Sequence, residues 1–265
     1  MTDYALDLSD DELTRYRNMA ERSYRAEADL WDTAGVRPGA NVADVGCGPA
    51  AVTAFLAELV APGGHVWAVD ATEEAVGAAG ATVAALGLDN VTIARADASA
   101  TGLEPDSFDV VMMRHVLAHN GPDEQRIVDH LATLVRPGGC VVLADGDCTA
   151  IRTWPPVPDY DDLIARYLAF HAQRGNDLKT GLRLDRVLAA AGLEVLDHRG
   201  RFEILPVAPG FRGPAWAARD AMVEVGLADA GDVDRWEATF ARIDAGDLEF
   251  TVFVAPFAAV GRRPV

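Results

Sequence analysis

A glycine-rich turn follows the first strongly apolar stretch of the chain, and its residue types suit the binding of a small molecule. Residues 41–45 form an apolar run, and Gly46-Cys47-Gly48 leads from it into a helical pattern that begins near Ala51. Two glycines let the backbone turn sharply and let a ligand approach closely, while the free N–H groups of a helix N-terminus can bind polar ligand atoms. The small Ala51 completes the spacing G-x-G-x-x-A.

Three acids extend this pattern. Asp44 stands two residues before the first glycine, where dinucleotide folds usually carry an apolar strand residue. Asp70 ends a second apolar run 22 residues after Gly48, and a carboxylate there can accept hydrogen bonds from both ribose hydroxyls. Asp97 follows a third apolar run and, taken alone, could equally cap a helix. Together these residues favour a nucleoside-type ligand.

Alternating strand and helix patterns must position these side chains. Strands are predicted at residues 41–45, 65–70, 91–95, 108–113 and 140–144, with amphipathic helices between them. Such alternation predicts parallel pairing with right-handed crossovers. The carboxyl ends of the strands then meet at one edge, where open α/β sheets bind ligands.

The block from Asp44 to Gly48 resembles the first motif of the class I S-adenosylmethionine-dependent methyltransferases, acid-x-Gly-x-Gly, and the turn at residues 136–139, Arg-Pro-Gly-Gly, is typical of them. The resemblance covers residues 35–145 by motif and residues 181–265 by order of elements. It implies an α/β fold, a Rossmann-like doubly wound seven-stranded sheet. The last strand, residues 249–261, is expected to run antiparallel between the fifth and sixth.

The resemblance also implies S-adenosyl-L-methionine as the cofactor and assigns residues to its parts. Asp44, Gly46 and Gly48 would surround the methionine part. Asp70 would bind the ribose and Asp97 the adenine amino group. The full set of predicted cofactor-binding residues is Asp44, Gly46, Cys47, Gly48, Asp70, Ala71, Asp97, Ala98, Arg114, His115, Tyr16 and Tyr24.

A helix is predicted ahead of the first strand. Ser9-Asp10-Asp11-Glu12 has the pattern of a capping box, and the helix should run to about residue 31. In similar methyltransferases such a helix folds over the cofactor, so Tyr16 and Tyr24 are candidates to line the site. Both could instead anchor the helix to the core.

Two histidines are the candidate catalytic residues. A sulfonium methyl group is already activated, so the protein must mostly position the reactants and exclude water. His119 and His171 could act as a base, because histidine titrates close to neutral pH. His119 could instead form a wall of the cofactor pocket, and His171 could be a packing residue. Asp145 and Asp147 are too few for an oxygen-ligated cation, so no metal is expected.

The chain divides into four expected parts. Residues 1–34 form a helical cap, residues 35–147 the cofactor-binding core, residues 148–180 a helical lid insertion, and residues 181–265 the second half of the core with a helical insertion at about 213–246. Aromatic residues in the insertions could face an apolar substrate or form the core of the lid itself.

Composition limits the partners. The 265-residue chain has a formal net charge of −18, with a single lysine, which argues against a nucleic-acid partner. Three unpaired cysteines indicate a reducing, cytoplasmic compartment. No signal peptide or membrane span is recognised, and a monomer or homodimer that acts on a small molecule is expected.

The implied activity is methyl transfer to an N, O or C atom of a small molecule, specialised metabolites among the candidates. Two alternatives remain open. One is a protein of the same fold that binds the cofactor without methylating, such as a cyclase or regulator. The other is an NAD(P)-dependent oxidoreductase, which the glycine spacing and Asp70 permit but Asp44 disfavours.

Overall fold

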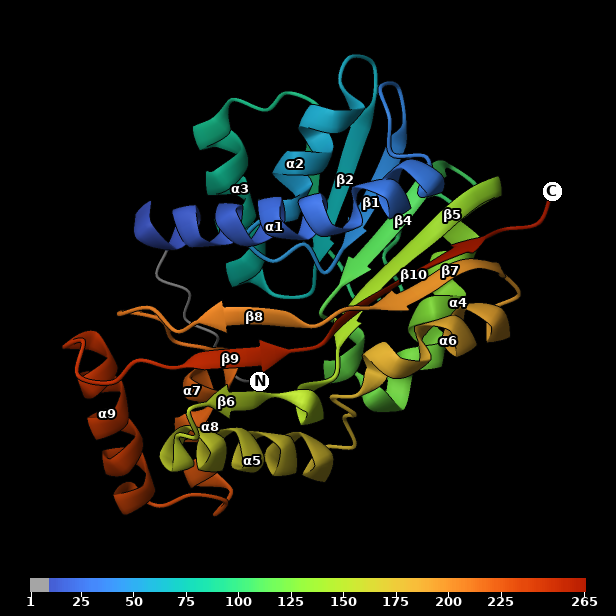
Figure 1. The fold of residues 1–265 in the computed structure, drawn as a ribbon. Helices are drawn as coiled ribbons and strands as arrows, with labels where there is room; N and C mark the ends of the chain where they lie inside the picture. Colours follow the sequence, from blue (N-terminus) through green and yellow to red (C-terminus); the bar gives the residue numbers. More distant parts are fainter. Residues whose placement is uncertain (1–9) are drawn as a thin grey trace.

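Seven strands form the central sheet, in the order β3-β2-β1-β4-β5-β10-β7 (Figure 1). The computed structural model describes residues 10–265, apart from the side chains of residues 10–16 and 19. The strands are β1 (Asn41–Val45), β2 (His65–Asp70), β3 (Val91–Arg95), β4 (Phe108–Arg114), β5 (Val135–Gly146), β7 (Glu194–Gly200) and β10 (Pro256–Arg262). The first five are parallel, and β10 is antiparallel to both β5 and β7. This confirms the predicted doubly wound sheet with its antiparallel strand between the fifth and sixth.

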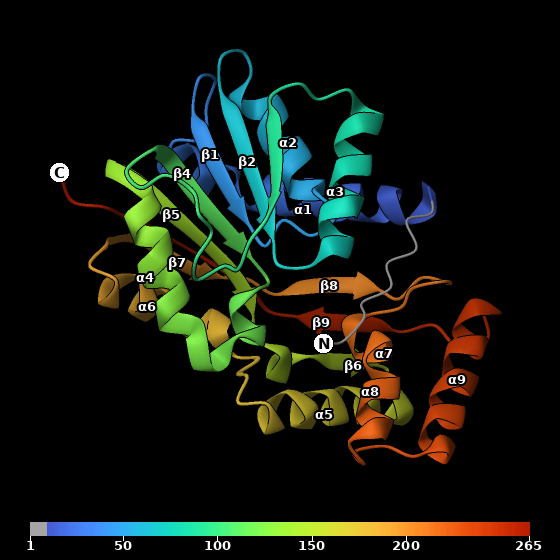
Figure 2. The same ribbon diagram turned by 180° about the vertical axis from the view of Figure 1, so that it is seen from behind.

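Both faces of the sheet are covered, which explains why its strands are almost continuously apolar. Side chains alternate between faces, so Val42 packs with Trp31 and Leu56 on one side, while Val45 packs with Ile127 on the other. The first face carries α1 (Asp10–Ala34), α2 (Ala51–Val60) and α3 (Glu73–Leu86); the second carries α4 (Glu124–Leu134) and α6 (Leu184–Ala190) (Figure 2).

The helix predicted to end near residue 31 continues to Ala34. Ser9, at which its capping box was predicted to begin, lies outside the described residues. The helix ends at Gly35, whose φ of +100° is a left-handed conformation that glycine adopts easily. Trp31 is fully buried near this end, so tertiary packing holds the additional turn.

A second layer, named the lid here, lies below the carboxyl edge of the sheet in Figure 1. It contains α5 (Pro158–Gln173), α7 (Pro214–Ala217), α8 (Arg219–Glu224) and α9 (Ala230–Asp244) around its own apolar core. It also contains a three-stranded sheet in the order β6-β9-β8, formed by β6 (Arg152–Trp154), β9 (Thr251–Val254) and β8 (Glu203–Pro206). The lid was expected to be helical, and the small sheet is a difference from that expectation.

The strand predicted at residues 249–261 and the segment at residues 193–205 are each divided between the two sheets. The run at 249–261 is β9 followed by β10, and the run at 193–205 is β7 followed by β8. At the first junction the Ala255 carbonyl accepts a hydrogen bond from the Asp147 N–H at 3.0 Å, and Pro256, which has no N–H, begins the next strand. Apolar periodicity reports burial but not the partner strand, so it does not show this change.

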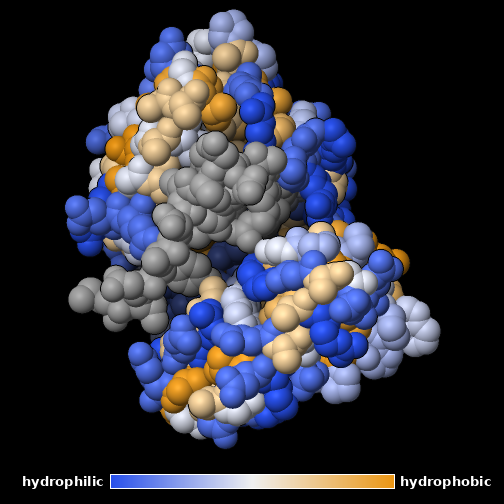
Figure 3. Space-filling view, turned by 90° about the vertical axis from the view of Figure 1, so that its left-hand side faces the viewer, coloured by the Kyte–Doolittle hydropathy of each residue, from blue (hydrophilic) through white to orange (hydrophobic). Residues whose placement is uncertain are grey.

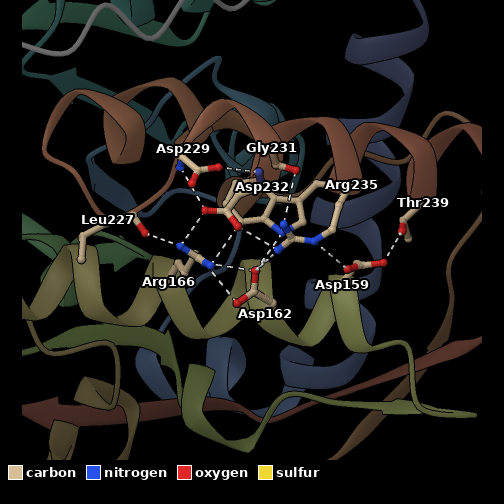
Figure 4. Close-up of polar contacts among 10 residues, drawn as sticks. Asp159, Asp162, Arg166, Leu227, Asp229, Gly231, Asp232, Arg235 and Thr239 are labelled. Carbon is tan, nitrogen blue, oxygen red and sulfur yellow. Dashed lines mark hydrogen bonds and ion pairs between the residues drawn. The ribbon is translucent and has the colours of Figure 1, made fainter.

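Buried and half-buried polar contacts join α5 to α9 within the lid (Figure 4). Arg166 donates to Asp162 at 3.0 Å and pairs with Asp232 at 2.8 Å. The indole N–H of Trp236 donates to Asp162 at 3.2 Å, and Arg235 donates to Asp232 at 2.8 Å. Because the charges compensate one another next to the buried Trp236 ring, the two helices pack as one unit. Between the lid and the core above it the surface is hollowed (Figure 3).

Candidate functional site

The carboxyl ends of β1, β2 and β3 border a cleft of about 220 Å³. Five predicted cofactor residues line it, namely Gly46, Asp70, Ala71, Asp97 and Ala98. The other lining residues are Val45, Ala96, Val116, Asn120, Asp123, Arg126 and Ile127. Polar groups therefore meet small and apolar side chains at the edge where the strand order reverses between β1 and β4, as expected for a ligand site in an open sheet.

The glycine loop has the shape that the sequence predicts. Gly46 has a φ of +79°, and a Cβ there would lie 2.3 Å from Cγ2 of Val116. Gly48 has a φ of +52°, and a Cβ there would meet no atom within 4 Å. Gly46 is thus needed for close packing of the loop on the segment after β4, while Gly48 faces open space that a ligand can enter.

Replacing Gly46 by alanine should therefore destabilise the protein more than replacing Gly48. Both variants must hold alanine at positive φ, but only Gly46→Ala also forces a methyl group into Val116, and overpacking of this kind costs roughly 1–3 kcal/mol. Urea unfolding would measure the difference. The double variant with Val116→Ala should recover the packing part of the loss, and equal midpoints for the two glycine variants would contradict the argument.

Asp70 and Asp97 stand at the ends of β2 and β3. Asp70 accepts hydrogen bonds from the Gly48 N–H at 3.0 Å and the Thr72 N–H at 3.2 Å, so its carboxylate also fixes the loop. Asp97 accepts from the N–H and hydroxyl of Ser99 at 2.8 and 2.6 Å. These bonds to Ser99 lower the pKa of Asp97 and keep it ionised. Asp97 organises the turn that follows its strand and still lines the cleft.

Asp44 lies beneath the loop rather than in the cleft wall. Its side chain is buried and accepts a hydrogen bond from the Thr53 hydroxyl of α2 at 2.6 Å. Burial raises the pKa of Asp44 to about 6, against the opposing effect of Thr53. Cys47 is also buried, and burial raises the pKa of its thiol, so it is a packing residue rather than a nucleophile.

The side chains of Arg114 and Tyr24, two further predicted cofactor residues, pack on other parts of the core and do not line the cleft. The Arg114 side chain pairs with Glu27 of α1, and both are buried. The Tyr24 ring packs against Trp31 at 5.3 Å and Phe55 at 5.8 Å between ring centroids, which anchors α1 to α2. The Tyr16 side chain lies outside the described part of the chain.

His115 directly follows β4 in a left-handed conformation, with a φ of +56°. This is uncommon for a residue with a Cβ. Its N–H donates to the Ala144 carbonyl at 2.8 Å, so the strained residue is held by the sheet. Burial and the Arg114 charge lower the pKa of His115, while Asp145 opposes them. Asp145 is buried and accepts from the N–H groups of Ala118 and Gly146 at 3.0 and 2.9 Å.

The two predicted catalytic residues lie together. His119 belongs to the short helix η1 (Leu117–His119) after β4, and His171 belongs to α5 of the lid. Their ring centroids are 4.8 Å apart. Burial lowers both pKa values, that of His171 to about 4, so both rings are neutral at neutral pH. The pair connects the cleft side of the core to the lid.

Sequence reasoning did not single out Val116, Asn120, Asp123 and Arg126, which complete the cleft. Asp123 belongs to the short helix η2 (Gly121–Asp123), and Arg126 donates to it at 3.1 Å. The only signal in the sequence was that these residues follow the carboxyl end of the fourth predicted strand, where a ligand site is expected. No group of three or more His, Cys, Asp or Glu residues in the described chain is arranged to hold a metal ion, and none of its helices could span a membrane.

The sequence of this chain is similar to those of known methyltransferases. Residues 42–139 match a protein family described as a methyltransferase domain. The chain is 38% identical over 114 residues to nocamycin O-methyltransferase of Saccharothrix syringae, covering 43% of this chain and 40% of that protein. It is 35% identical over 107 residues to demethylmenaquinone methyltransferase of Bacillus cytotoxicus, covering 40% of this chain and 45% of that protein. The aligned part thus spans less than half of either relative.

Solved structures share the fold. A SAM-dependent methyltransferase from Aquifex aeolicus superposes with a TM-score of 0.51 at 19% identity, over 70% of this chain and 90% of that chain. The 4+2 cyclase SpnF superposes with a TM-score of 0.55 at 16% identity, over 91% of this chain and 81% of that chain. At these identities the likeness shows the fold alone.

Proposed function

We propose that this chain, which carries a class I S-adenosylmethionine-dependent methyltransferase domain, binds S-adenosyl-L-methionine in the cleft and methylates a small molecule. The observation that carries the proposal is the convergence of the glycine loop, Asp70 and Asp97 at the carboxyl ends of three neighbouring strands. An adenosyl ligand needs acceptors for its ribose hydroxyls and its amino group, and apolar contacts for its base. The cleft offers both.

The residues of the cleft suit the parts of that ligand. Asp70 would accept from the ribose hydroxyls and Asp97 from the adenine amino group, with Ala71, Ala98 and Ile127 against the base. The open space beside Gly48 would admit the methionine part, above the buried charge of Asp44. The bound cofactor supplies a sulfonium methyl group. The protein then has to orient an acceptor and exclude water, and orientation alone can contribute roughly 7–11 kcal/mol.

A small acceptor is favoured over a macromolecule. The net charge of −18 opposes binding to a phosphate backbone. The lid stands over the carboxyl edge and contributes His171 next to His119, which encloses the space where an acceptor would lie. A cytoplasmic monomer or homodimer remains our expectation.

A non-methylating role is the second candidate, because the cyclase SpnF shares this fold over 91% of the chain. Calorimetric titration with S-adenosylmethionine, S-adenosylhomocysteine and NADH tests the cofactor first. Binding of the two adenosyl compounds without NADH is expected. Binding of NADH alone would overturn the cofactor assignment and favour an oxidoreductase. Release of S-adenosylhomocysteine on incubation with acceptors then separates methyl transfer from a non-methylating role.

Binding of S-adenosylhomocysteine should strengthen as the pH rises through about 6. The pKa of Asp44 is raised to about 6 by burial, so below that pH the carboxyl is protonated and cannot attract the ammonium group of the methionine part. The affinity should fall by up to about tenfold per pH unit below 6 and level off above it. Calorimetry between pH 5 and 8 checks this. Asp44→Asn should flatten the profile, and an unchanged slope in that variant would contradict the assignment.

A further inference from the structure

An asparagine of the lid fixes the hydrogen-bonding state of His171. Asn176 follows α5, and its Oδ1 accepts a hydrogen bond from the Gly121 N–H at 3.2 Å. Its Nδ2 lies 3.1 Å from Nδ1 of His171. Because the amide oxygen must face the backbone N–H, the amide NH2 group faces the ring and donates to it. Nδ1 of His171 is therefore an acceptor and carries no proton.

The backbone of Gly121 packs closely against the backbone of Gly175 and Asn176. A Cβ on Gly121 would lie 2.2 Å from the Gly175 carbonyl oxygen and 2.9 Å from Cα of Asn176. A glycine is thus required where the η2 segment of the core meets the end of α5. The Gly121 N–H that donates to the Asn176 side chain is therefore held in place by close backbone packing.

A neutral His171 must then carry its proton on Nε2. Burial, His119 and Arg174 lower the pKa of His171 to about 4, so the ring is neutral at neutral pH. The Arg174 guanidinium group, which contributes to this shift, is held over the Phe170 ring with its Cζ 3.5 Å from the ring centroid. His171 can therefore donate one hydrogen bond from Nε2, but it cannot accept a proton there.

His119, in contrast to Nε2 of His171, can accept a proton. In the part of the chain that the structure describes, neither of its ring nitrogens has a hydrogen-bond partner. The titratable groups that interact with it are His115, which follows β4, and His171 of the lid. His119 keeps much of its surface exposed, but desolvation by its neighbours lowers its pKa, so a free imidazole lone pair is available at neutral pH. A proton acceptor and a hydrogen-bond donor thus stand side by side, 4.8 Å apart between ring centroids.

We propose that this pair selects an acidic hydroxyl, a phenol or an enol with a second oxygen beside it, as the methyl acceptor. His119 accepts the hydroxyl proton, Nε2–H of His171 donates to the neighbouring oxygen, and Asn176 is a positioning residue that keeps His171 in the donor form. This inference rests on the proposed function, because the same site must first bind the methyl donor.

The reaction balances with these groups alone. The hydroxyl oxygen forms a bond to the methyl carbon while the carbon–sulfur bond of the donor breaks, and its electron pair stays on sulfur. The hydroxyl proton passes to His119 and then to water. A neutral imidazole of lowered pKa is a weak base, which suits a phenol or enol better than an aliphatic alcohol. An amine would leave the fixed donor of His171 without an acceptor oxygen.

Nitrogen-15 NMR of the imidazole rings tests the tautomer directly. In the wild-type protein at pH 7, His171 should be neutral with its proton on Nε2. Asn176→Asp places a carboxylate beside Nδ1, so the proton should move to Nδ1 and the pKa of His171 should rise. A wild-type ring protonated on Nδ1, or on both nitrogens, would overturn the assignment of Asn176 whatever the protein methylates.

Matched acceptors test the chemical class. With S-adenosylmethionine, the wild-type protein should methylate one oxygen of 2,3-dihydroxynaphthalene and leave 2,3-diaminonaphthalene, which has no oxygen, unmodified. His119→Gln should slow the reaction roughly 10²–10⁴-fold and remove the basic group from its pH profile. Asn176→Asp should lower the rate on 2,3-dihydroxynaphthalene but not on 2-naphthol, which lacks the second oxygen. His65→Gln, a histidine bonded to Thr92 at the far end of β2, is the matched control and should retain full activity.

The outcomes separate the two proposals. If S-adenosylhomocysteine does not bind, the proposed function fails. If it binds but the methyl group goes to the amine, to neither compound, or to the hydroxyl at an undiminished rate in His119→Gln, the hydroxyl assignment alone is overturned.

Discussion

Replacing Asp70 by alanine should weaken binding of S-adenosylhomocysteine by about 100-fold or more, since hydrogen bonds to a charged group are worth roughly 1.5–3 kcal/mol each and two ribose hydroxyls would lose their acceptor. The carboxylate also accepts from the Gly48 and Thr72 N–H groups. The variant therefore loses both a ligand contact and the bond that holds the loop in shape. Calorimetry measures the affinity, and circular dichroism checks that the fold is retained.

Two further variants give this prediction its controls. Asp70→Asn keeps one acceptor oxygen and the size of the side chain, so its affinity should lie between those of the wild type and Asp70→Ala. Asp89→Ala removes an exposed carboxylate from the turn before β3 and should leave binding unchanged. Wild-type affinity in Asp70→Ala would remove the ribose assignment and with it the main support for an adenosyl ligand.

The candidate cofactor cleft could be predicted from the sequence because its signals are local. Gly46 and Gly48 mark positive φ angles, and Asp70 ends an apolar run, so each residue reports its own place at a strand end. Parallel topology then brings these ends to one edge without any further information. The cleft contains five of the residues predicted in this way.

The residues of the proposed acceptor site could be predicted only as separate candidates. His119 and His171 were recognised by type, but their contact depends on how the lid folds back on the core. Asn176 gave no signal at all, since its role follows from a backbone N–H of Gly121 and a ring of α5. The lid also contains strands that continue the sequence of core strands, so its shape could not be derived from periodicity.

Arg114 is a single residue whose contact could not be predicted, because its partner is distant in the sequence. Its position after β4 suggested a side chain in the cofactor pocket, but the guanidinium group pairs with Glu27, 87 residues earlier in the chain. Arg201 donates to the same carboxylate at 3.1 Å. A cluster of three charges from α1, β4 and the segment after β7 cannot be recognised from spacing. It shows that the predicted cap is held to the edge of the sheet by buried ionic contacts.

Glu27 should consequently be a critical residue for stability. Its side chain is 2% exposed, and it compensates two arginine charges, one of which is also buried. Glu27→Ala would leave Arg114 buried without a partner, and breaking a buried pair in this way costs about 3–5 kcal/mol. Urea unfolding should show a large fall in midpoint. Asp29→Ala, which removes the exposed pair with Arg199 two residues later in the same helix, should leave the midpoint almost unchanged.

The pH dependence of this loss has a defined sign. Burial raises the pKa of Glu27, but Arg114 and Arg201 outweigh it, so the folded-state pKa lies below its ordinary value. The stabilising contribution is therefore complete at neutral pH and is lost as the pH falls through the folded-state pKa. The difference in stability between the wild type and Glu27→Gln should shrink on acidification. A difference that is constant with pH, or equal losses in the Glu27 and Asp29 variants, would show that the ionic cluster does not hold α1 in place.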